Sequence, residues 1–223
     1  MLVYVLSDLH GEIRRFFQML ELIEFTDEDI MYIIGDVLDR CEGGIEILLD
    51  IMSRHNISLI KGNHEDLFLQ AIKEDATPQE WANWRWNGGN VTEEAYQKLS
   101  KEDQNRIVKY LEGCPVSADI AVSGRKFHLV HAWPGDEYDC LWSHPYGRSN
   151  PFPDKTLIIG HTVTARLSEN AIEDGKIVIY PRPGTKEREQ LRYLAIDCGA
   201  GHLSLPGRQL ACLRLDDFRE FYV

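Results

Sequence analysis

The 223-residue sequence has few of the features that mark secreted or membrane proteins. Its five cysteines are scattered and form no C-x-x-C pair, which counts against a disulfide framework and against a zinc–thiolate site. No apolar run approaches the ~18 residues of a membrane span, and the N-terminus lacks the basic lead of a signal peptide. We therefore expect a cytoplasmic protein with reduced thiols and no membrane partner.

Basic residues are also scarce. Lys and Arg number 24 against 36 Asp and Glu, which gives a formal net charge of -12. Proteins that bind a phosphate backbone are expected to show a basic face, so this balance counts against nucleic acid as a main partner. Solubility accounts for most of the acidity, and the remaining carboxylates are free to bind cations.

Apolar runs that end in polar clusters recur along the chain. Continuous runs rich in Val, Ile and Leu are typical of strands buried on both faces. Amphipathic patterns at 12–24 and 43–55 predict helices between the first three runs. This alternation predicts a parallel sheet, with ligand sites beyond the carboxyl ends of its strands. The runs and their polar ends are 2–6 with Ser7 to Gly11, 30–34 with Gly35-Asp36, 57–60 with Gly62 to Glu65, 127–130 with His131, and 157–159 with Gly160-His161.

The rest of the chain predicts more helix and a second set of strands. Residues 66–112 are mostly helical in pattern, and loops rich in Pro and Gly are expected at 134–154 and 181–188. With no clear linker, we expect one domain over residues 1–223, made of two β-layers flanked by helices. Short strands are predicted at 116–122, 127–132, 157–161, 176–180, 192–197 and 209–215.

The polar residues that follow these runs have the chemistry of a metal site. Apart from Arg40, each is an oxygen or nitrogen donor to a cation, or a proton carrier. Carboxylate and imidazole without thiolate suit Mn²⁺, Fe or Zn²⁺ better than soft metals. A carboxylate such as Asp36 can give one oxygen to each of two cations. The set is Asp8, His10, Asp36, Asp39, Arg40, Asn63, His64, His131 and His161.

Five segments in one order resemble the signature of the phosphoprotein phosphatase branch of the calcineurin-like metallophosphoesterases. They are S-D-L-H-G at 7–11, G-D-V-L-D-R-C at 35–41, G-N-H-E at 62–65, V-H-A around His131 and G-H-T at 160–162.

Two further segments resemble the small bacterial and phage serine/threonine phosphatases. They are W-x-x-N-G-G at 84–89 and I-D-C-G-A at 196–200. The whole match spans residues 1–200. It implies a fold of the α/β (α+β) class, a four-layer αββα sandwich in which two mixed β-sheets are flanked by helices.

The resemblance also implies two divalent metal ions as cofactors, with Mn²⁺ expected first and Fe or Zn²⁺ as alternatives. The ligands expected for the first ion are Asp8, His10 and Asp36. The ligands expected for the second ion are Asp36, Asn63, His131 and His161. In this arrangement Asp36 is shared between the ions, which lower the pKa of a bridging water and give a hydroxide at neutral pH.

The remaining matched residues are expected to handle the phosphate group. Arg40, Asn63 and His64 would bind its oxygens, with Arg40 making two parallel hydrogen bonds. His64 would protonate the leaving oxygen, and Asp39 would orient and stabilise its imidazolium. The family uses a second phosphate-binding arginine, for which Arg148 lies in the corresponding stretch, although the residues around it depart from the bacterial pattern.

The function expected is a dinuclear-metal-dependent phosphomonoester hydrolase, a serine/threonine protein phosphatase that uses the bridging hydroxide directly. Its partner would be a phosphorylated protein or peptide, or a small phosphorylated metabolite. A symmetrical dinucleoside tetraphosphate (diadenosine tetraphosphate) hydrolase is the alternative, and it would be expected to show a base-stacking pocket. A non-catalytic metal-binding scaffold is a third reading, which predicts the loss of a ligand or of His64, and neither is lost.

Other residues have a simpler structural interpretation. Cys41 stands where the family has glycine, and it would be strained if that position needs a positive φ. We expect it to be an inert packing residue, with a reactive thiol, whose pKa the neighbouring arginine would lower, as the alternative. His144 and His202 are expected to be ordinary loop histidines rather than extra ligands. We expect the tryptophans at 81, 84 and 86 to anchor the helical segment rather than line a groove. The charged run at 186–189 is expected to be solvated.

Overall fold

The structure is a computed structural model that describes residues 1–167, 175–180 and 193–223. Within these residues ten strands form two five-stranded sheets. The first has the order β10-β9-β1-β2-β3 and contains β1 (Val3–Leu6), β2 (Ile30–Ile34), β3 (Ile57–Ile60), β9 (Ala211–Arg214) and β10 (Arg219–Tyr222). The second has the order β4-β5-β6-β8-β7 and contains β4 (Ser117–Val122), β5 (Arg125–Val130), β6 (Thr156–Ile159), β7 (Val178–Tyr180) and β8 (Tyr193–Ala195). The expected loop at 181–188 and the charged run at 186–189 lie outside the described residues.

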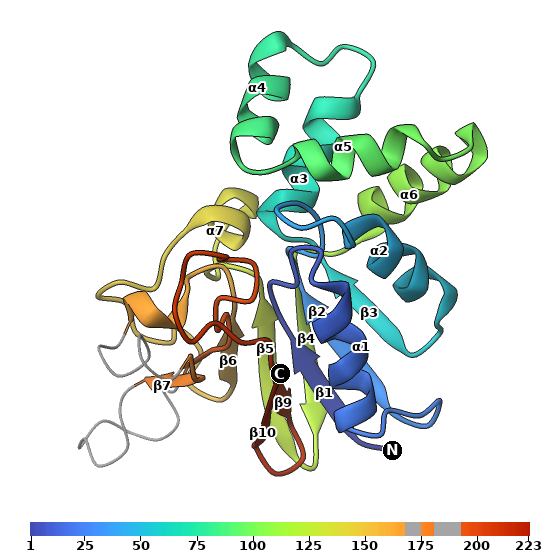
Figure 1. Cartoon of the computed structure of the whole chain (residues 1–223). Helices are drawn as coiled ribbons and strands as arrows, with labels where there is room; N and C mark the ends of the chain where they lie inside the picture. Colours follow the sequence, from blue (N-terminus) through green and yellow to red (C-terminus); the bar gives the residue numbers. More distant parts are fainter. Residues whose placement is uncertain (168–174, 181–192) are drawn as a thin grey trace.

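Helices cover the sheets and extend beyond them. Figure 1 shows α1 and α2 beside the first sheet, and α3 to α6 gathered together at one end of the molecule. The helices predicted at 12–24, 43–55 and within 66–112 are confirmed. The described helices are α1 (Ile13–Leu22), α2 (Gly44–Ser53), α3 (Asn63–Ile72), α4 (Pro78–Trp86), α5 (Asn90–Gln97), α6 (Lys101–Gly113), α7 (Glu137–Trp142) and the 3₁₀-helix η1 (Thr164–Arg166).

Three strands in each sheet are parallel. β1 pairs with β2, and β2 with β3, in the parallel register that the sequence predicted. β5, β6 and β8 are likewise parallel, whereas the outer strands β4, β7, β9 and β10 pair antiparallel. Both sheets are therefore mixed. The carboxyl ends of parallel strands share one edge of a sheet, so residues that follow these strands come together there.

The layers can be followed from the alternating side chains of β1. Val3 and Val5 pack in a buried cluster with residues of β5 and β6, which places them between the two sheets. Tyr4 and Leu6 pack in another cluster with residues of α1 and α2. A third cluster joins Cys140 of α7 to β6 and β8 on the outer side of the second sheet. The result is the helix–sheet–sheet–helix order expected from the sequence.

Besides the three-residue η1, two described elements were not predicted. The helix α7 lies inside the stretch 134–154, which was expected to be a loop, and its Asp136 side chain accepts a hydrogen bond from the N–H of Asp139 at the helix start. Strand β10 pairs with β9 along the edge of the first sheet. Both elements are short, so their sequence periodicity is weak. The expectation of one domain over 1–223 stays a prediction.

The three tryptophans of α4 have different environments. Trp84 is fully buried, Trp81 packs against the same cluster, and Trp86 is 90% exposed. The predicted anchoring role is thus correct for the first two and wrong for Trp86. Residues two apart on a helix point about 200° apart, so burial of Trp84 turns Trp86 outward.

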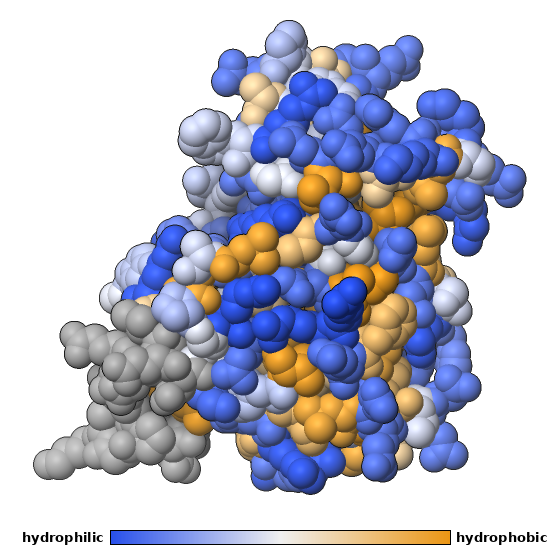
Figure 2. All heavy atoms as spheres, in the orientation of Figure 1, coloured by the Kyte–Doolittle hydropathy of each residue, from blue (hydrophilic) through white to orange (hydrophobic). Residues whose placement is uncertain are grey.

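Hydrophilic side chains cover much of the face shown in Figure 2, with hydrophobic side chains in patches between them. Among the helices that the structure describes, none combines the length and the apolar character needed to cross a bilayer.

Candidate active site

The predicted site residues follow the parallel strands at positions where the backbone turns sharply. Six of them have a left-handed backbone, with φ between 44° and 70°. Gly62 permits a close approach in the same region, because a Cβ atom there would lie 2.3 Å from Oδ1 of Asp36. The chain thus turns back at each strand end and presents a polar side chain to the centre. The six residues are Asp8, His10, Asp36, Asp39, Arg40 and His161.

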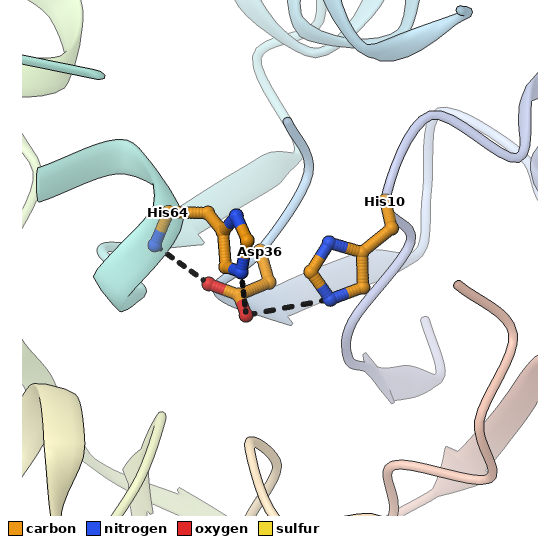
Figure 3. A group of neighbouring side chains, drawn as sticks. All are labelled: His10, Asp36 and His64. Carbon is orange, nitrogen blue, oxygen red and sulfur yellow. Dashed lines mark hydrogen bonds and ion pairs between the residues drawn. The ribbon is translucent and has the colours of Figure 1, made fainter. Parts of the chain in front are cut away.

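Asp36 lies between two groups of candidate metal ligands. Its Oδ2 is 3.5 Å from Nε2 of His10 and 3.9 Å from Nε2 of His64 (Figure 3). Its Oδ1 is 3.4 Å from Nε2 of His131, on the other side. One group that could hold a metal ion is therefore His10, Asp36 and His64, and the other is Asp36, His131 and His161. Each oxygen of one carboxylate faces a different group.

Backbone carbonyl groups orient the imidazoles of both groups. Nδ1 of His10 lies 3.1 Å from the Leu38 carbonyl oxygen, and Nδ1 of His131 lies 2.8 Å from the Ile34 carbonyl oxygen. Both carbonyls accept from Nδ1–H, so Nε2 of each ring is directed at Asp36 and can serve as a ligand.

Asn63 completes the second group. Its side-chain oxygen is 2.9 Å from Nε2 of His131 and 3.0 Å from Nδ1 of His161. Asp8 lies beside this group, because its carboxylate accepts the backbone N–H of His161 at 3.1–3.2 Å and the Ser7 hydroxyl. Asp8 is not among the atoms clustered closely enough to form either ligand group. Its assignment to the first ion stays a prediction.

The electrostatics of the site fit a cation. Burial and the charge of Asp197 raise the pKa of Asp8 well above its usual range. Burial also raises the pKa of Asp197 to about 6, and one oxygen of this carboxylate is buried with no hydrogen-bond partner among the residues that the structure describes. Burial alone would raise the pKa of Asp36, but the charges of His131 and His64 outweigh it and hold the pKa well below its usual range. Hard oxygen and imidazole donors that crowd together in this way are suited to a divalent metal.

The same charges predict how the metal-free protein responds to pH. Burial lowers the pKa of His131, but the carboxylate of Asp36 outweighs burial and raises it to about 10. The unfolded value is about 6.5, so this pair stabilises the fold fully below pH ~6.5 and less as the pH rises toward 10. We expect the Tm of chelator-treated protein to be roughly 5 °C lower at pH 9.5 than at pH 7. Calorimetric scans check this, and a His131→Asn variant that keeps the full difference contradicts it.

His64 forms a pair with Asp39, as predicted. Its Nδ1 is 2.7 Å from Oδ2 of Asp39, and both groups are buried. The Trp84 indole N–H donates to both oxygens of Asp39 at 3.0 Å, and the Thr92 hydroxyl donates to Oδ1 at 2.7 Å. The carboxylate is therefore fixed on all sides and must accept from Nδ1–H of His64. That leaves Nε2 of His64 directed at the site.

Arg40 reaches the same Nε2 atom. One nitrogen of its guanidinium is 3.0 Å from Nε2 of His64, and another is 3.1 Å from Nε2 of His202. The backbone N–H of Arg40 donates to the Gly88 carbonyl oxygen at 3.1 Å, so the W-x-x-N-G-G segment supports this arginine directly. His202 lies in a loop and outside both ligand groups of the described chain, as expected, but its contact with Arg40 was not predicted.

Glu65 is a supporting residue to which sequence reasoning gave no role. Its two carboxylate oxygens accept four backbone N–H groups, from Asp36, Gly62, Val37 and Leu38, at 2.8–3.2 Å. It ties the turn after β2 to the start of α3, and so fixes Asp36 relative to Asn63. Its place in G-N-H-E was visible in the sequence, but nothing local shows that it reaches back to residue 36.

We expect Glu65→Gln to lower the free energy of unfolding by roughly 3 kcal/mol. The NH₂ group of the glutamine replaces a carboxylate oxygen that accepts backbone N–H groups, and a donor cannot satisfy other donors. Urea denaturation measures this. Glu94→Gln, at another glutamate of the helical segment, is the matched control, and equal stabilities of the two variants would contradict the prediction.

Cys41 and Arg148 lie near the site and differ in how they compare with expectation. Cys41 does not have a positive φ, so the strain considered for that conformation does not arise. Burial and then Glu12 raise the pKa of its thiol to about 11 and outweigh the lowering by Arg208 and Arg40, which fits the expected inert packing residue rather than a reactive thiol. Arg148 lies against Asp139, 3.8 Å away, and over the ring of Trp133. Its role as a second phosphate-binding arginine stays a prediction.

The comparison with protein families identifies the family of this chain. A family model described as calcineurin-like phosphoesterase matches residues 1–193. The chain belongs to the calcineurin-like phosphoesterase family. These phosphoesterases use divalent metal ions, and the two ligand groups around Asp36 could hold such ions in this member.

Individual relatives of this calcineurin-like phosphoesterase are distant. A symmetrical bis(5'-nucleosyl)-tetraphosphatase from Salmonella typhimurium is 35% identical over 74 residues, which cover 32% of this chain and 26% of that protein. The chain thus matches about a quarter of the length of these curated relatives.

Solved structures support the fold. A putative diadenosine tetraphosphatase has a TM-score of 0.61 at 12% identity, with 100% of this chain and 92% of that chain covered. A protein serine/threonine phosphatase from Saccharomyces cerevisiae has a TM-score of 0.60 at 14% identity, with 96% and 72% covered. At these identities the likeness is one of fold alone.

Proposed function

We propose that this phosphoesterase is a dinuclear-metal-dependent phosphomonoester hydrolase of the phosphoprotein phosphatase branch, acting on phosphoserine and phosphothreonine. The observation that carries the proposal is the position of Asp36, whose two oxygens face two different ligand groups. A site for one ion has no need of this arrangement, whereas a pair of ions requires a shared ligand. The five free cysteines fit a reducing cytoplasm.

Two divalent cations, with Mn²⁺ as the first choice, would be held by Asp8, His10, Asp36, Asn63, His131 and His161. When bound, such ions neutralise phosphate charge and lower the pKa of a nearby water. The donor set contains no thiolate, which suits these metals.

The residues around this centre match the requirements of phosphate ester hydrolysis. Arg40 donates hydrogen bonds through a planar guanidinium and can bind two phosphate oxygens at once. Nε2 of His64 can carry a proton to the leaving oxygen, because Nδ1 is already held by Asp39. A serine or threonine alkoxide is a poor leaving group, so this proton matters most for those substrates.

A dinucleoside tetraphosphate is the second candidate substrate, and a column of rings favours it. The ring of His144 stacks on that of His161 at 5.0 Å and 24°, and the ring of Tyr146 lies 5.4 Å from His144. Tyr146 is 53% exposed. A base could stack on its ring, while phosphates reach the centre beside His161. The Salmonella relatives carry the name of such an enzyme.

A comparison of substrates tests both candidates. Protein supplied with Mn²⁺ is given p-nitrophenyl phosphate, a phosphothreonine peptide and diadenosine tetraphosphate side by side. Faster turnover of the peptide supports the protein phosphatase. Faster turnover of diadenosine tetraphosphate, lost in Tyr146→Ala, supports the second candidate. If none is hydrolysed, the chain is a metal-binding scaffold and the proposal is wrong.

A further inference from the structure

The loop that follows β8 is packed tightly over the site. Gly201 lies so close to His10 that a Cβ atom there would be 2.4 Å from the imidazole ring. Arg208 donates to the Glu12 carboxylate at 2.6 Å and to the Ala200 carbonyl oxygen. These contacts fix the loop against the segment that carries His10 and Glu12. They place the partly buried His202 beside Arg40, which lies 162 positions earlier in the chain.

The Arg40 guanidinium is held between two imidazoles. One terminal nitrogen donates to Nε2 of His64 at 3.0 Å, and the other donates to Nε2 of His202 at 3.1 Å. A guanidinium has donors and no acceptor, so both Nε2 atoms are acceptors in this phosphate-free arrangement. The proton of a neutral His202 is then on Nδ1. Nε2 of His64 can carry the proton of a general acid only after the Arg40 guanidinium has turned from it to phosphate. His202 belongs to neither of the ligand groups found in the described chain. The side-chain hydrogen bond that its ring makes there is the one with Arg40.

The hydrogen bond to His202 affects phosphate binding because an arginine side chain loses much rotamer entropy when it is ordered. The backbone of Arg40 is already fixed by the hydrogen bond to the Gly88 carbonyl oxygen. The side chain beyond it is long, and a phosphate that had to order it would bind more weakly. An acceptor opposite His64 restricts the plane of the guanidinium before phosphate arrives.

We propose that His202 is a positioning residue, which holds the Arg40 guanidinium in the orientation that receives phosphate oxygens. The inference rests on the proposed function for its kinetic consequence, but not for its effect on phosphate binding. The acceptor at Nε2 is the feature required. Glutamine can place an amide oxygen near that atom, whereas alanine cannot.

The test compares His202→Ala and His202→Gln with the parent protein and with His55→Ala, which removes an exposed histidine. All are loaded with Mn²⁺. Calorimetry gives the Kd of inorganic phosphate, and p-nitrophenyl phosphate gives KM and kcat. We expect His202→Ala to raise Kd and KM about tenfold, with kcat changed less than about threefold. His202→Gln should return both constants to within about threefold of the parent, and His55→Ala should match the parent.

An Arg40→Ala background shows whether His202 acts through Arg40. In that background His202→Ala should leave the phosphate Kd unchanged, because the contact is already gone. An equal loss of affinity in both backgrounds would overturn the inference, as would an unchanged Kd in the single variant with a native melting temperature. If the parent hydrolyses no phosphate ester, the proposed function fails, and the phosphate Kd values still decide the role of His202.

Discussion

We expect His64→Asn to lower kcat for a phosphothreonine peptide by about 10³-fold, the scale of a lost general acid. Asparagine keeps an N–H near the place of Nδ1, so the hydrogen bond to Asp39 and the buried environment are retained. It has no group that can deliver a proton from the place of Nε2. The loss should be smaller for p-nitrophenyl phosphate, because nitrophenolate leaves without protonation. Steady-state kinetics on both substrates measure this difference.

The metal content of the same variant separates two roles for His64. This imidazole is also close enough to His10 and Asp36 to be a ligand. A general acid can be removed without loss of metal, so two ions should remain bound after dialysis. Loss of one ion for each chain, with equal kinetic losses on both substrates, would make His64 a ligand and not the acid. His55→Asn serves as the control.

Asp36→Asn should remove both metal ions at once. The carboxamide keeps one oxygen, which can still accept the backbone N–H of His64 as Oδ1 does at 3.0 Å. It then turns an NH₂ group toward His10 in place of the second oxygen. We expect the affinity for each Mn²⁺ ion to fall at least about 100-fold, and activity to fall by about 10⁴-fold or more. Titration calorimetry and metal analysis give the affinities and the stoichiometry.

Asp39→Asn is the matched control for that loss. It changes another buried carboxylate of the site, one that belongs to neither ligand group and contacts Trp84, Thr92 and Nδ1 of His64. It should keep two ions and lose turnover. If Asp36→Asn instead bound two ions with unchanged affinity, the carboxylate would not be shared, and the dinuclear proposal would fail.

The parts of this molecule that the sequence predicted are those with a local signal. A buried strand followed at once by a polar cluster identifies a strand end, and parallel pairing brings such ends together. Asp36, Asn63 and His131 were found in this way. The strands themselves were predicted because their apolar runs are continuous, as in Ile30–Ile34.

What the sequence could not show depends on contacts between distant segments. Trp84 reaches Asp39 across 45 residues, and His202 reaches Arg40 across 162. No periodicity records such a pairing. Asp197 is similar, because it stands in a recognised segment yet gives no local sign that its carboxylate is buried near Asp8. The roles of Trp84, His202 and Asp197 therefore become visible only in the three-dimensional structure.

The left-handed backbone at six site residues has a consequence for the whole molecule. Each non-glycine residue in that conformation costs on the order of 1–2 kcal/mol, less for Asp and Asn than for other side chains. This strain is located where strands end, and the packing of the two sheets must offset it. Substitutions that relieve this strain would raise thermal stability but would move the site side chains. Stability and activity therefore place opposite demands on the backbone at Asp8, His10, Asp36, Asp39, Arg40 and His161.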